Sequence, residues 1–259
     1  MEIKESELVL TEDKRIYHLG LHPEQLGDYI ITVGDPQRVE KVSQHFDTIN
    51  YINQKREFLT HTGTLGKKSI SVIGTGIGPD NIDILLNEID ALKNIDLNTR
   101  EIKKEKSKLK IIRLGTSGSL NPEIPTDTIV ASQCGLGFDG LLNFYDYNPE
   151  EYQISAMEIL QKEVPELFTV CKPYIFKGSK FLLDNLGDDI IKGITLTAGG
   201  FYGPQGRMLR LNEKMRYIIE KISLLDFNGT KITNFEMETS AIYGLSHLLG
   251  MKLFLLMPS

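Results

Sequence analysis

Three short apolar runs in this sequence each end at a glycine-containing turn. The runs cover Tyr29–Val33, Ser69–Ile73 and Lys110–Leu114, and the turns after them read GDP, GTGIGPDN and GTSGSL. Short runs rich in β-branched residues predict buried strands. Amphipathic segments with helical spacing follow two of them, over Gln37–Phe46 and Ile82–Leu92. Strands that alternate with amphipathic helices predict an α/β fold with a mostly parallel or mixed sheet.

The rest of the chain continues this alternation less regularly. We expect strands at Thr128–Ser132, Gly193–Thr197, Lys231–Phe235 and Lys252–Met257, and helices at Pro149–Lys162, Asn212–Leu224 and Met237–Leu249. The stretch 96–108 mixes positive and negative charges, which favours a solvated connection over a binding patch. A length of 259 residues suits one large α/β unit, so we predict a single domain over residues 1–259.

The amino-acid composition limits which binding partners and which cellular compartment are expected for this protein. A net charge of −6 argues against a surface that binds nucleic acid. Cys134 and Cys171 do not form a CxxC pair, and two free thiols are typical of a reducing cytosol. The first ten residues lack the pattern of a signal peptide, and no apolar run approaches membrane-spanning length. We therefore expect a cytoplasmic protein without nucleic-acid or membrane partners.

Two of the strand–turn junctions carry an arginine beside residues that suit an anion. In GDPQR, Gly34 and Arg38 flank a predicted helix start, where backbone N–H groups and the helix dipole favour negative charge. The alternative is an ordinary Asp-Pro turn with a solvated arginine. In RLGTSG, Arg113 and Thr116 suit close approach of a phosphate or a sugar. The alternative there is a structural ion pair at the sheet edge.

Other patterns argue against several kinds of site. The glycines of GTGIGPDN do not match GxGxxG, and Asp80 would place a carboxylate where a pyrophosphate should lie, which disfavours a nicotinamide dinucleotide. His18 stands alone, and a lone histidine is usually structural or solvated. The sequence contains no metal-spaced His/Cys/Asp cluster and no GxSxG elbow.

The loop FYGPQGR combines an aromatic ring, an amide and a guanidinium, contributed by Phe201, Gln205 and Arg207. An aromatic face can stack on a planar heterocycle, a glutamine can donate and accept hydrogen bonds, and an arginine donates. The loop therefore predicts a site for a planar heterocycle. The alternative is a turn with a core aromatic residue and a surface arginine.

Two glutamates stand at the start of a predicted helix, in Glu236-Met237-Glu238. Negative charge is favoured at a helix N-terminus, so capping explains one of them. The second can accept hydrogen bonds from sugar hydroxyls, and Met237 can pack against a sugar ring.

Taken in order, these segments resemble the nucleoside phosphorylase superfamily, and within it the uridine phosphorylases. The similarity begins at His18 and includes YHLGLHPEQLGDYIITVGDPQRVEKV, KREFLTHTG, GTGIGP, RLGTSGSL, FYGPQGR and FEMETSAIY. Several motifs in the expected order are more specific than any single motif. The resemblance implies a single-domain, three-layer α/β/α nucleoside phosphorylase fold, in which a central mixed, twisted sheet is flanked by helices.

The resemblance also implies roles for individual residues. Phosphate would be bound by Gly34, Arg38, Arg56, Arg113 and Thr116. The nucleoside would be bound by His18, Phe201, Gln205, Arg207, Glu236, Met237 and Glu238. His18 and Arg56 would complete the site of a neighbouring subunit, with His18 at the ribose 5′-hydroxyl. Catalysis would rest on Arg38, Arg113, Arg207 and Glu238, whose carboxylate would take the 2′- and 3′-hydroxyls.

The implied reaction is phosphorolysis of uridine to uracil and ribose 1-phosphate in pyrimidine salvage, with inorganic phosphate as co-substrate and no cofactor. The implied assembly is a homo-oligomer built from dimers, with a hexamer favoured. Family members often bind a monovalent cation such as K⁺ at a subunit interface, here near Glu57, Ile77 and Asn81, although they carry a serine in place of Asn81. They also continue past the strand at Lys252, so we expect this chain to lack the family's final C-terminal helix.

Two kinds of alternative remain. The first is a purine nucleoside phosphorylase, or a nucleosidase that uses water. The arginines disfavour water as the nucleophile, and FYGPQGR favours a pyrimidine. The second is a protein that binds nucleosides without turnover, or a truncated and inactive enzyme.

Overall fold

The computed structural model describes residues 2–187 and 189–258 of the chain. Contacts between residues divide the chain into two compact units, which are described separately. The first unit contains Met1–Ile77, Asn81–Leu114 and Leu249–Lys252. The second unit contains Gly78–Asp80, Gly115–Leu248 and Leu253–Ser259.

The first unit is built on strands in the order β7-β1-β4-β3-β2. These are β1 (Tyr29–Val33), β2 (Thr48–Lys55), β3 (Phe58–Leu65), β4 (Lys68–Gly74) and β7 (Lys110–Leu114). Strand β1 lies between β4 and β7 and is parallel to both, whereas β3 is antiparallel to β2 and β4. The sheet is therefore mixed. A short hairpin of β5 (Ile95–Asp96) and β6 (Glu101–Ile102) and the 3₁₀ turn η1 (Pro23–Gln25) complete the unit.

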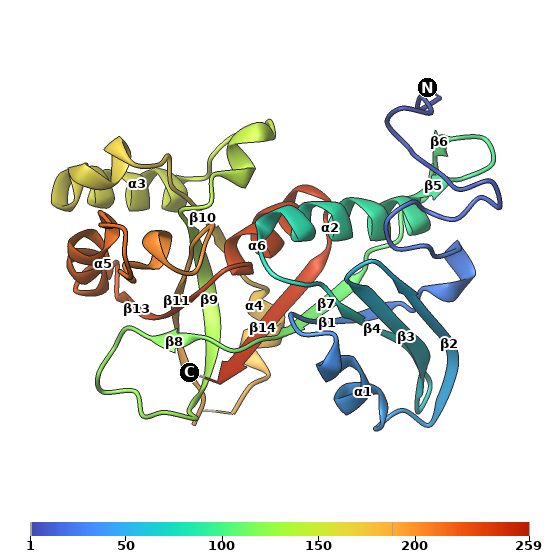
Figure 1. The fold of residues 1–259 in the computed structure, drawn as a ribbon, viewed down its shortest axis with the longest axis horizontal. Coiled ribbons are helices and arrows are strands. Elements are labelled where there is room, and N and C mark those ends of the chain that lie inside the picture. Colours follow the sequence, from blue (N-terminus) through green and yellow to red (C-terminus); the bar gives the residue numbers. More distant parts are fainter. Residues whose placement is uncertain (1, 188, 259) are drawn as a thin grey trace. The chain divides into compact units, whose positions relative to one another are not determined.

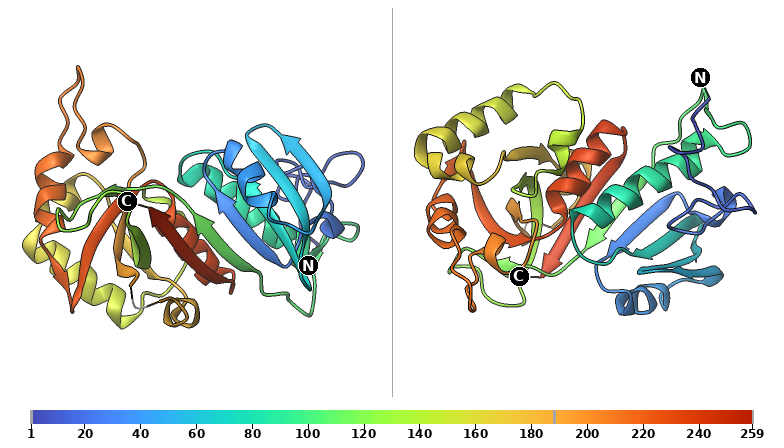
Figure 2. Two further views of the ribbon diagram at one scale, coloured as in Figure 1. Left: turned by 90° about the horizontal axis from the view of Figure 1, so that it is seen from below. Right: turned by 45° about the horizontal axis from the view of Figure 1, so that its top comes forward.

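Two helices, α1 (Gln37–Ser43) and α2 (Pro79–Asn94), lie on opposite faces of this sheet (Figures 1 and 2). Val39 of α1 packs with Val33 and Val72, which point to the same side of neighbouring strands. The apolar residues of α2 recur at helical spacing and are buried, as in Leu85 and Ile89. Burial of both sheet faces explains why β1 is mostly apolar, with Thr32 as its buried polar residue.

The second unit is also a mixed sheet flanked by helices (Figure 1). Its parallel strands are β9 (Ile129–Gly137), β11 (Ile191–Thr197) and β13 (Thr230–Glu236). Strands β10 (Tyr174–Lys177) and β14 (Lys252–Pro258) pair antiparallel with β9, and β8 (Gly118–Ser119) and β12 (Asp226–Phe227) pair antiparallel with β13.

The helices of the second unit cover both faces of its sheet. Helices α3 (Glu151–Glu163) and α5 (Met215–Ser223) share one apolar cluster with β9 and β11. Helix α6 (Thr239–Leu248) packs on the other face, against β9, β10 and β11. A methyl group added at Gly135 of β9 would lie 2.8 Å from Cα of Ser240 in α6, so glycine allows this close approach. The remaining short helices are η2 (Leu141–Phe144), η3 (Pro165–Thr169), α4 (Lys180–Asp184) and η4 (Gly203–Gln205).

The sequence-based expectations for fold class and most elements are confirmed. Several predictions of element ends were wrong, such as the start of α5, which begins at Met215 instead of Asn212. Helix α1 ends at Ser43 instead of Phe46, because His45 and Phe46 donate to carbonyls three residues back and the helix closes in tighter turns. Strand β9 continues to Gly137 because it pairs with the whole of β11. The prediction of a single domain over residues 1–259 stays a prediction.

Candidate active site

Three parallel strands of the first unit end at the same level. Val33, the last residue of β1, lies beside Gly74 of β4 and Leu114 of β7. The N–H of Thr75 donates to the carbonyl of Val33 at 2.8 Å, which holds two of the following turns together. In open α/β sheets, ligands bind outside the carboxyl ends of the strands. This edge is therefore a candidate site.

Gly34, Arg38 and Arg113 meet at this edge and are called the anion cluster. A methyl group added at Gly34 would lie 3.5 Å from Nη2 of Arg38 and 3.9 Å from Nη2 of Arg113. Arg113 is only 2% exposed and stands beside Thr32 in the sheet. Arg38 is half-buried in the first turn of α1. Two guanidinium groups that converge on a backbone without a side chain can bind a small anion.

Asp35 limits what the start of α1 contributes to that site. Its Oδ1 accepts a hydrogen bond at 2.9 Å from the N–H of Gln37, the first residue of the helix. The Asp35 carboxylate thus satisfies the first N–H group of the helix. Anion binding at this edge would rest on the two arginines more than on the helix terminus.

His18 and Arg56 also belong to the first unit. Nδ1 of His18 lies 2.6 Å from Oε1 of Glu88 in α2, and the same carboxylate accepts hydrogen bonds from the N–H groups of His18 and Leu19. Arg56 is exposed in the turn between β2 and β3, with its guanidinium carbon 5.7 Å from the ring centre of Tyr17. The role of Glu88 was not predicted from the sequence, where it is marked merely as an acidic residue on the inward face of an amphipathic helix.

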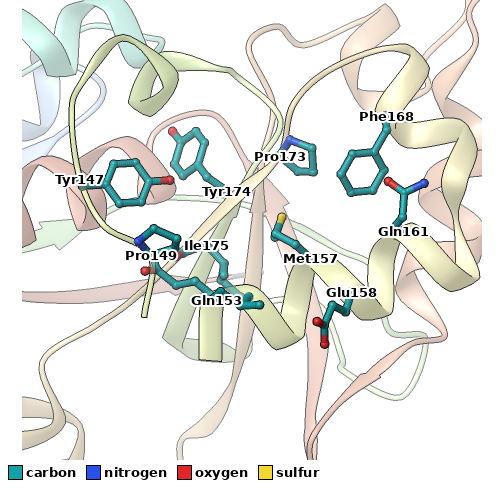
Figure 3. Close-up of a pocket in the computed structure, with 11 residues that line it drawn as sticks. Tyr147, Pro149, Gln153, Met157, Glu158, Gln161, Phe168, Pro173, Tyr174 and Ile175 are labelled. Atoms are coloured by element: carbon teal, nitrogen blue, oxygen red, sulfur yellow. Dashed lines mark hydrogen bonds between the residues drawn. The ribbon is translucent and has the colours of Figure 1, made fainter. Parts of the chain in front are cut away.

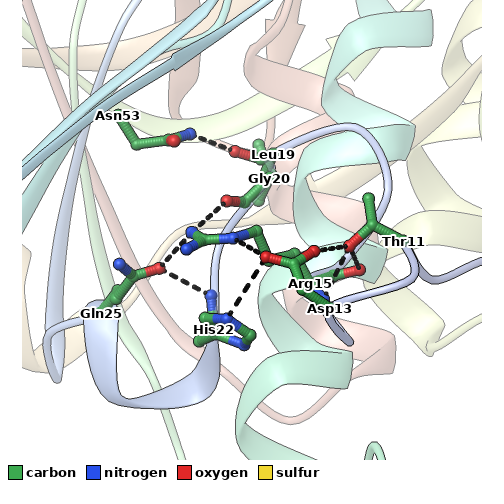
Figure 4. Close-up of polar contacts among 8 residues, drawn as sticks. All are labelled: Thr11, Asp13, Arg15, Leu19, Gly20, His22, Gln25 and Asn53. Carbon is green, nitrogen blue, oxygen red and sulfur yellow. Dashed lines mark hydrogen bonds and ion pairs between the residues drawn. The ribbon is translucent and has the colours of Figure 1, made fainter.

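A network of polar contacts holds the segment that carries His18 (Figure 4). Arg15 donates to the carbonyl of Gly20 at 3.1 Å, to Oε1 of Gln25 at 3.0 Å and to Asp13 at 2.7 Å. The Thr11 hydroxyl and then Arg15 lower the pKa of Asp13 to about 2. Asn53 of β2 donates to the carbonyl of Leu19 at 2.7 Å, which ties the segment to the sheet.

The residues expected near a monovalent cation lie around Gly76. A methyl group there would stand 2.5 Å from Nδ2 of Asn81 and 3.3 Å from Cγ of Glu57, whereas Ile77 is 69% exposed. A cation at this place stays a prediction. Within residues 2–187 and 189–258, no group of three or more His, Cys, Asp and Glu side chains could hold a metal ion. No helix in that part of the chain is long and apolar enough to cross a membrane.

The parallel strands of the second unit likewise end in register. Thr197 of β11 lies beside Gly137 of β9 and Glu236 of β13. The FYGPQGR loop follows the end of β11, and the Glu-Met-Glu segment begins with the last residue of β13. All of the sequence-predicted nucleoside residues except His18, which belongs to the first unit, therefore gather at one edge of one sheet.

Arg207 contacts both Phe201 and Gln205, and the three residues are called the base cluster. The guanidinium carbon of Arg207 lies 4.0 Å from the ring centre of Phe201, and Nη1 donates to the Phe201 carbonyl at 3.0 Å and to Oε1 of Gln205. Phe201 is 51% exposed, whereas Gln205 is buried. The cluster thus presents an open aromatic face beside an amide and a guanidinium, which can take a planar heterocycle.

Glu236, the last residue of β13, and Glu238, two residues later, have different partners. Glu236 accepts hydrogen bonds from the hydroxyl of Thr197 and from the N–H groups of Glu238 and Thr239, at 2.8–3.0 Å. These contacts cap the start of α6. Glu238 is 4% exposed and accepts from the N–H of Gly78 at 2.8 Å. Glu236 is therefore the glutamate that caps α6, whereas the carboxylate of Glu238 bonds Gly78.

The other two predicted residues of this unit are more open. Met237 is half-buried and Thr116 is exposed. Next to Thr116, Oγ of Ser117 accepts a hydrogen bond from Nδ2 of Asn234 at 2.8 Å, so the RLGTSG turn is attached to β13.

A separate cavity of about 350 Å³ lies between α3, η3 and β10 (Figure 3). Its walls are mostly apolar and include Tyr147, Met157, Phe168 and Pro173. Tyr174 also lines it. None of the residues predicted from the sequence to bind substrate lines this cavity.

Residues 28–257 match the family model described as "Phosphorylase superfamily". A uridine phosphorylase of Treponema pallidum is 35% identical over 136 residues, which are 52% of this chain and 46% of that relative. The match thus spans less than half of that relative's length. A uridine phosphorylase of Thermococcus kodakarensis is 27% identical over 242 residues, covering 93% of this chain and 76% of that relative.

The fold is shared with a solved structure. A crystal structure of a Trypanosoma brucei nucleoside phosphorylase that shows uridine phosphorylase activity superposes with a TM-score of 0.85 at 29% identity. The superposition covers 97% of this chain and 89% of that chain. A purine nucleoside phosphorylase of Streptococcus suis is also similar, at 29% identity over 56% of this chain and 56% of that relative. The nucleoside phosphorylase fold expected from the sequence is confirmed.

Proposed function

The chain belongs to the phosphorylase superfamily, and on that premise we propose that it is a nucleoside phosphorylase whose substrate is uridine. The reaction joins inorganic phosphate to C1′ of the ribose as the bond from C1′ to N1 of uracil breaks. The products are ribose 1-phosphate and uracil. No cofactor is required for this exchange.

The anion cluster is the observation that carries the proposal. Nη2 of Arg38 and Nη2 of Arg113 both lie within 4 Å of the position that a methyl group at Gly34 would occupy. Charge-assisted hydrogen bonds from two guanidiniums would hold phosphate firmly and fix its orientation. A fixed nucleophile removes much of the entropic barrier of a reaction between two substrates. A hydrolase that uses water has no need of such a cluster.

The residues of the second unit suit the nucleoside. As the glycosidic bond breaks, positive charge develops on the ribose and negative charge on the leaving uracil. Arg207 and Gln205 would stabilise the uracil anion by donating hydrogen bonds, and Phe201 would stack on its ring. Glu238 would accept from the 2′- and 3′-hydroxyls of the ribose, with Met237 against the sugar. Glu236 would act by holding the backbone of that segment.

Similarity to uridine phosphorylases from two organisms supports uridine as the substrate. A purine nucleoside is the second candidate, because a purine nucleoside phosphorylase is similar over about half of the chain. The base cluster favours the pyrimidine, since an amide and a guanidinium can pair with two ring carbonyls.

We further propose that the active enzyme is a homo-oligomer. His18 and Arg56 would reach the site of a neighbouring copy, where the guanidinium would add a third positive charge to phosphate. The family resemblance favours a hexamer built from dimers, with K⁺ at an interface near Glu57 and Asn81. If those residues cross between copies, activity should fall when the protein is diluted to monomers.

The test is release of uracil from uridine by the purified protein, with and without phosphate, and with inosine as the control nucleoside. Phosphate-dependent loss of uridine alone would support the proposal. Release without phosphate would indicate a nucleosidase, and cleavage of inosine alone would indicate a purine phosphorylase. Binding of uridine without any product would indicate a nucleoside-binding protein or an inactive enzyme.

A further inference from the structure

Asp139 is a hydrogen-bonded junction at the edge of the second unit where the nucleoside residues gather. It lies two residues past the end of β9 and is half-buried. Its two oxygens accept from the hydroxyl of Tyr174 at 2.6 and 2.7 Å, from Oγ of Ser240 at 2.8 Å and from the N–H of Leu141 at 2.9 Å. These partners come from β10, α6 and η2 respectively.

The donor in the contact with Tyr174 is clear. Burial raises the pKa of the Tyr174 hydroxyl well above its usual range, and the charge of Asp139 raises it further. The hydroxyl therefore keeps its proton and donates to the carboxylate. It also lies 3.1 Å from Oγ of Ser240, so the tyrosine, the serine and the aspartate form a closed triangle. A carboxylate with several charge-assisted bonds resists displacement.

From Ser240 the contacts continue to the proposed ribose site. The N–H of Ser240 donates to Oγ1 of Thr197 at 2.9 Å, and Oγ1 of Thr197 donates to Glu236 at 2.8 Å. Glu236 in turn accepts from the N–H of Glu238 at 2.9 Å. The backbone of Glu238 is thus fixed through a chain of bonds that begins at Asp139.

Asp139 also touches the strand exit that leads to the base cluster. A methyl group added at Gly199 would lie 3.5 Å from Cα of Asp139, so the chain leaving β11 passes against this residue. A shift of Asp139 would therefore displace both the FYGPQGR loop and the Glu-Met-Glu segment, which carry the proposed nucleoside residues.

We infer that Asp139 is a positioning residue of the nucleoside site, which acts by fixing the first turn of α6 and so the carboxylate of Glu238. This inference rests on the proposed function for its kinetic consequence. Asp139 would not touch the substrate. Its effect would appear as a loss of the enzyme's preference for a nucleoside with a 2′-hydroxyl.

Two conservative variants test this inference. Asp139→Asn keeps the size of the side chain but removes the charge and replaces one acceptor with a donor. Tyr174→Phe removes one hydroxyl and keeps the ring, which also lines the cavity in Figure 3. The matched control is Tyr152→Phe, because the hydroxyl of Tyr152 accepts a long hydrogen bond, of 3.3 Å, from the N–H of Lys177 and stands outside the series of bonds that leads from Asp139 to Glu238.

The kinetic readout is the ratio of kcat/KM for uridine to that for 2′-deoxyuridine. We expect Asp139→Asn to lower this ratio about tenfold, because a shifted carboxylate loses a charged hydrogen bond that only uridine can make. Tyr174→Phe should lower it about threefold. The KM for phosphate should stay at the wild-type value in both. Equal losses for the two nucleosides would mean a merely structural role and would overturn the inference.

Amide hydrogen exchange of the peptide around residues 236–242 gives a second readout that needs no activity. Both variants should exchange faster at Thr239 and Ser240, while Tyr152→Phe should match the wild type. If the wild-type protein releases no uracil from uridine, the proposed function fails and exchange alone decides the inference. Unchanged exchange in Asp139→Asn would then overturn it.

Discussion

The N–H of Gly78 donates a hydrogen bond to Oε1 of Glu238 at 2.8 Å. Glu238 is almost fully buried, and Gly78 has a φ of +105°, a conformation that only glycine adopts readily. A backbone donor in a turn whose conformation is set by glycine holds its acceptor in one direction. The carboxylate is therefore oriented before a substrate arrives, as a group that recognises sugar hydroxyls should be.

The first prediction concerns Glu238→Ala. If the carboxylate accepts from the 2′-hydroxyl, the variant should lose roughly 1.5–3 kcal/mol of transition-state binding for uridine and much less for 2′-deoxyuridine. The measurement is kcat/KM for both nucleosides. The matched control is Glu220→Ala, which removes the same charge from the exposed side of α5. An equal loss on both nucleosides would argue against a contact with the 2′-hydroxyl.

The second prediction concerns Arg113, which is 2% exposed in β7. Arg113→Ala should lose most of its turnover and its response to phosphate, on the order of a hundredfold in kcat/KM for phosphate, because the nucleophile is no longer held. Arg113→Lys keeps the positive charge but lacks the planar guanidinium. Its kcat/KM for phosphate should therefore lie between those of the wild type and Arg113→Ala.

Initial rates at varied phosphate measure this effect. Lys110→Ala is the control, because it removes a positive charge from the exposed start of the same strand. A thermal melt of each variant checks that it folds. Wild-type kinetics in a folded Arg113→Ala protein would refute the role of the anion cluster.

The strands that the sequence predicted best are those with a simple pattern. Strands β1 and β7 coincide with the predicted Tyr29–Val33 and Lys110–Leu114, because β1 is covered on both faces and Ile111 of β7 lies in the core. The hairpin of β2 and β3 was missed. Most of β2 is exposed, and β3 buries polar residues such as Thr60 and His61, so neither strand shows the usual alternation.

Prediction of the candidate site from the sequence was likewise limited to features that leave a local pattern. Glycine-containing turns after predicted strands indicated Gly34, Arg38 and Arg113, whereas the candidates of the second unit came from the side-chain types in FYGPQGR and Glu236-Met237-Glu238. Contacts between residues far apart in the chain leave no local pattern in the sequence, so they could not be predicted from it. The capping role of Glu236, the bond from Gly78 to Glu238 and the junction at Asp139 all depend on strands and helices meeting in three dimensions.

The third prediction concerns the effect of pH on stability through His61. Burial lowers the pKa of His61 below its usual range, and the charge of Glu40 opposes this only in part. The folded protein therefore keeps this ring neutral while the unfolded chain takes up a proton as pH falls through about 6.5. The free energy of unfolding should decrease on acidification, by at most about 1.4 kcal/mol per pH unit from this group.

Urea unfolding between about pH 7.5 and pH 5.5 measures that slope. In His61→Asn the slope should be shallower, because the amide can still bond Oγ of Ser43, which lies 2.8 Å from Nδ1 of His61, but cannot be protonated. His45→Asn changes an exposed histidine and should leave the slope as it is. A steeper slope in His61→Asn would contradict the assignment.

The fourth prediction concerns Gly206, next to Gln205 and Arg207 of the base cluster. Gly206 has a φ of +69°, and a methyl group there would lie 2.9 Å from Cα of Arg216. Gly206→Ala should cost about 1–2 kcal/mol of stability from the left-handed conformation alone. The contact with α5 should also move the loop, so KM for uridine should rise while KM for phosphate stays unchanged.

Gly66→Ala separates the effect of backbone strain from the effect of a contact with α5. Gly66 also has a positive φ, of +57°, but a methyl group there would meet no atom within 4 Å. This variant should lose a similar amount of stability from strain and keep wild-type KM values for both substrates. If Gly206→Ala behaves like Gly66→Ala, with lower stability and unchanged KM for uridine, the FYGPQGR loop does not bind the base.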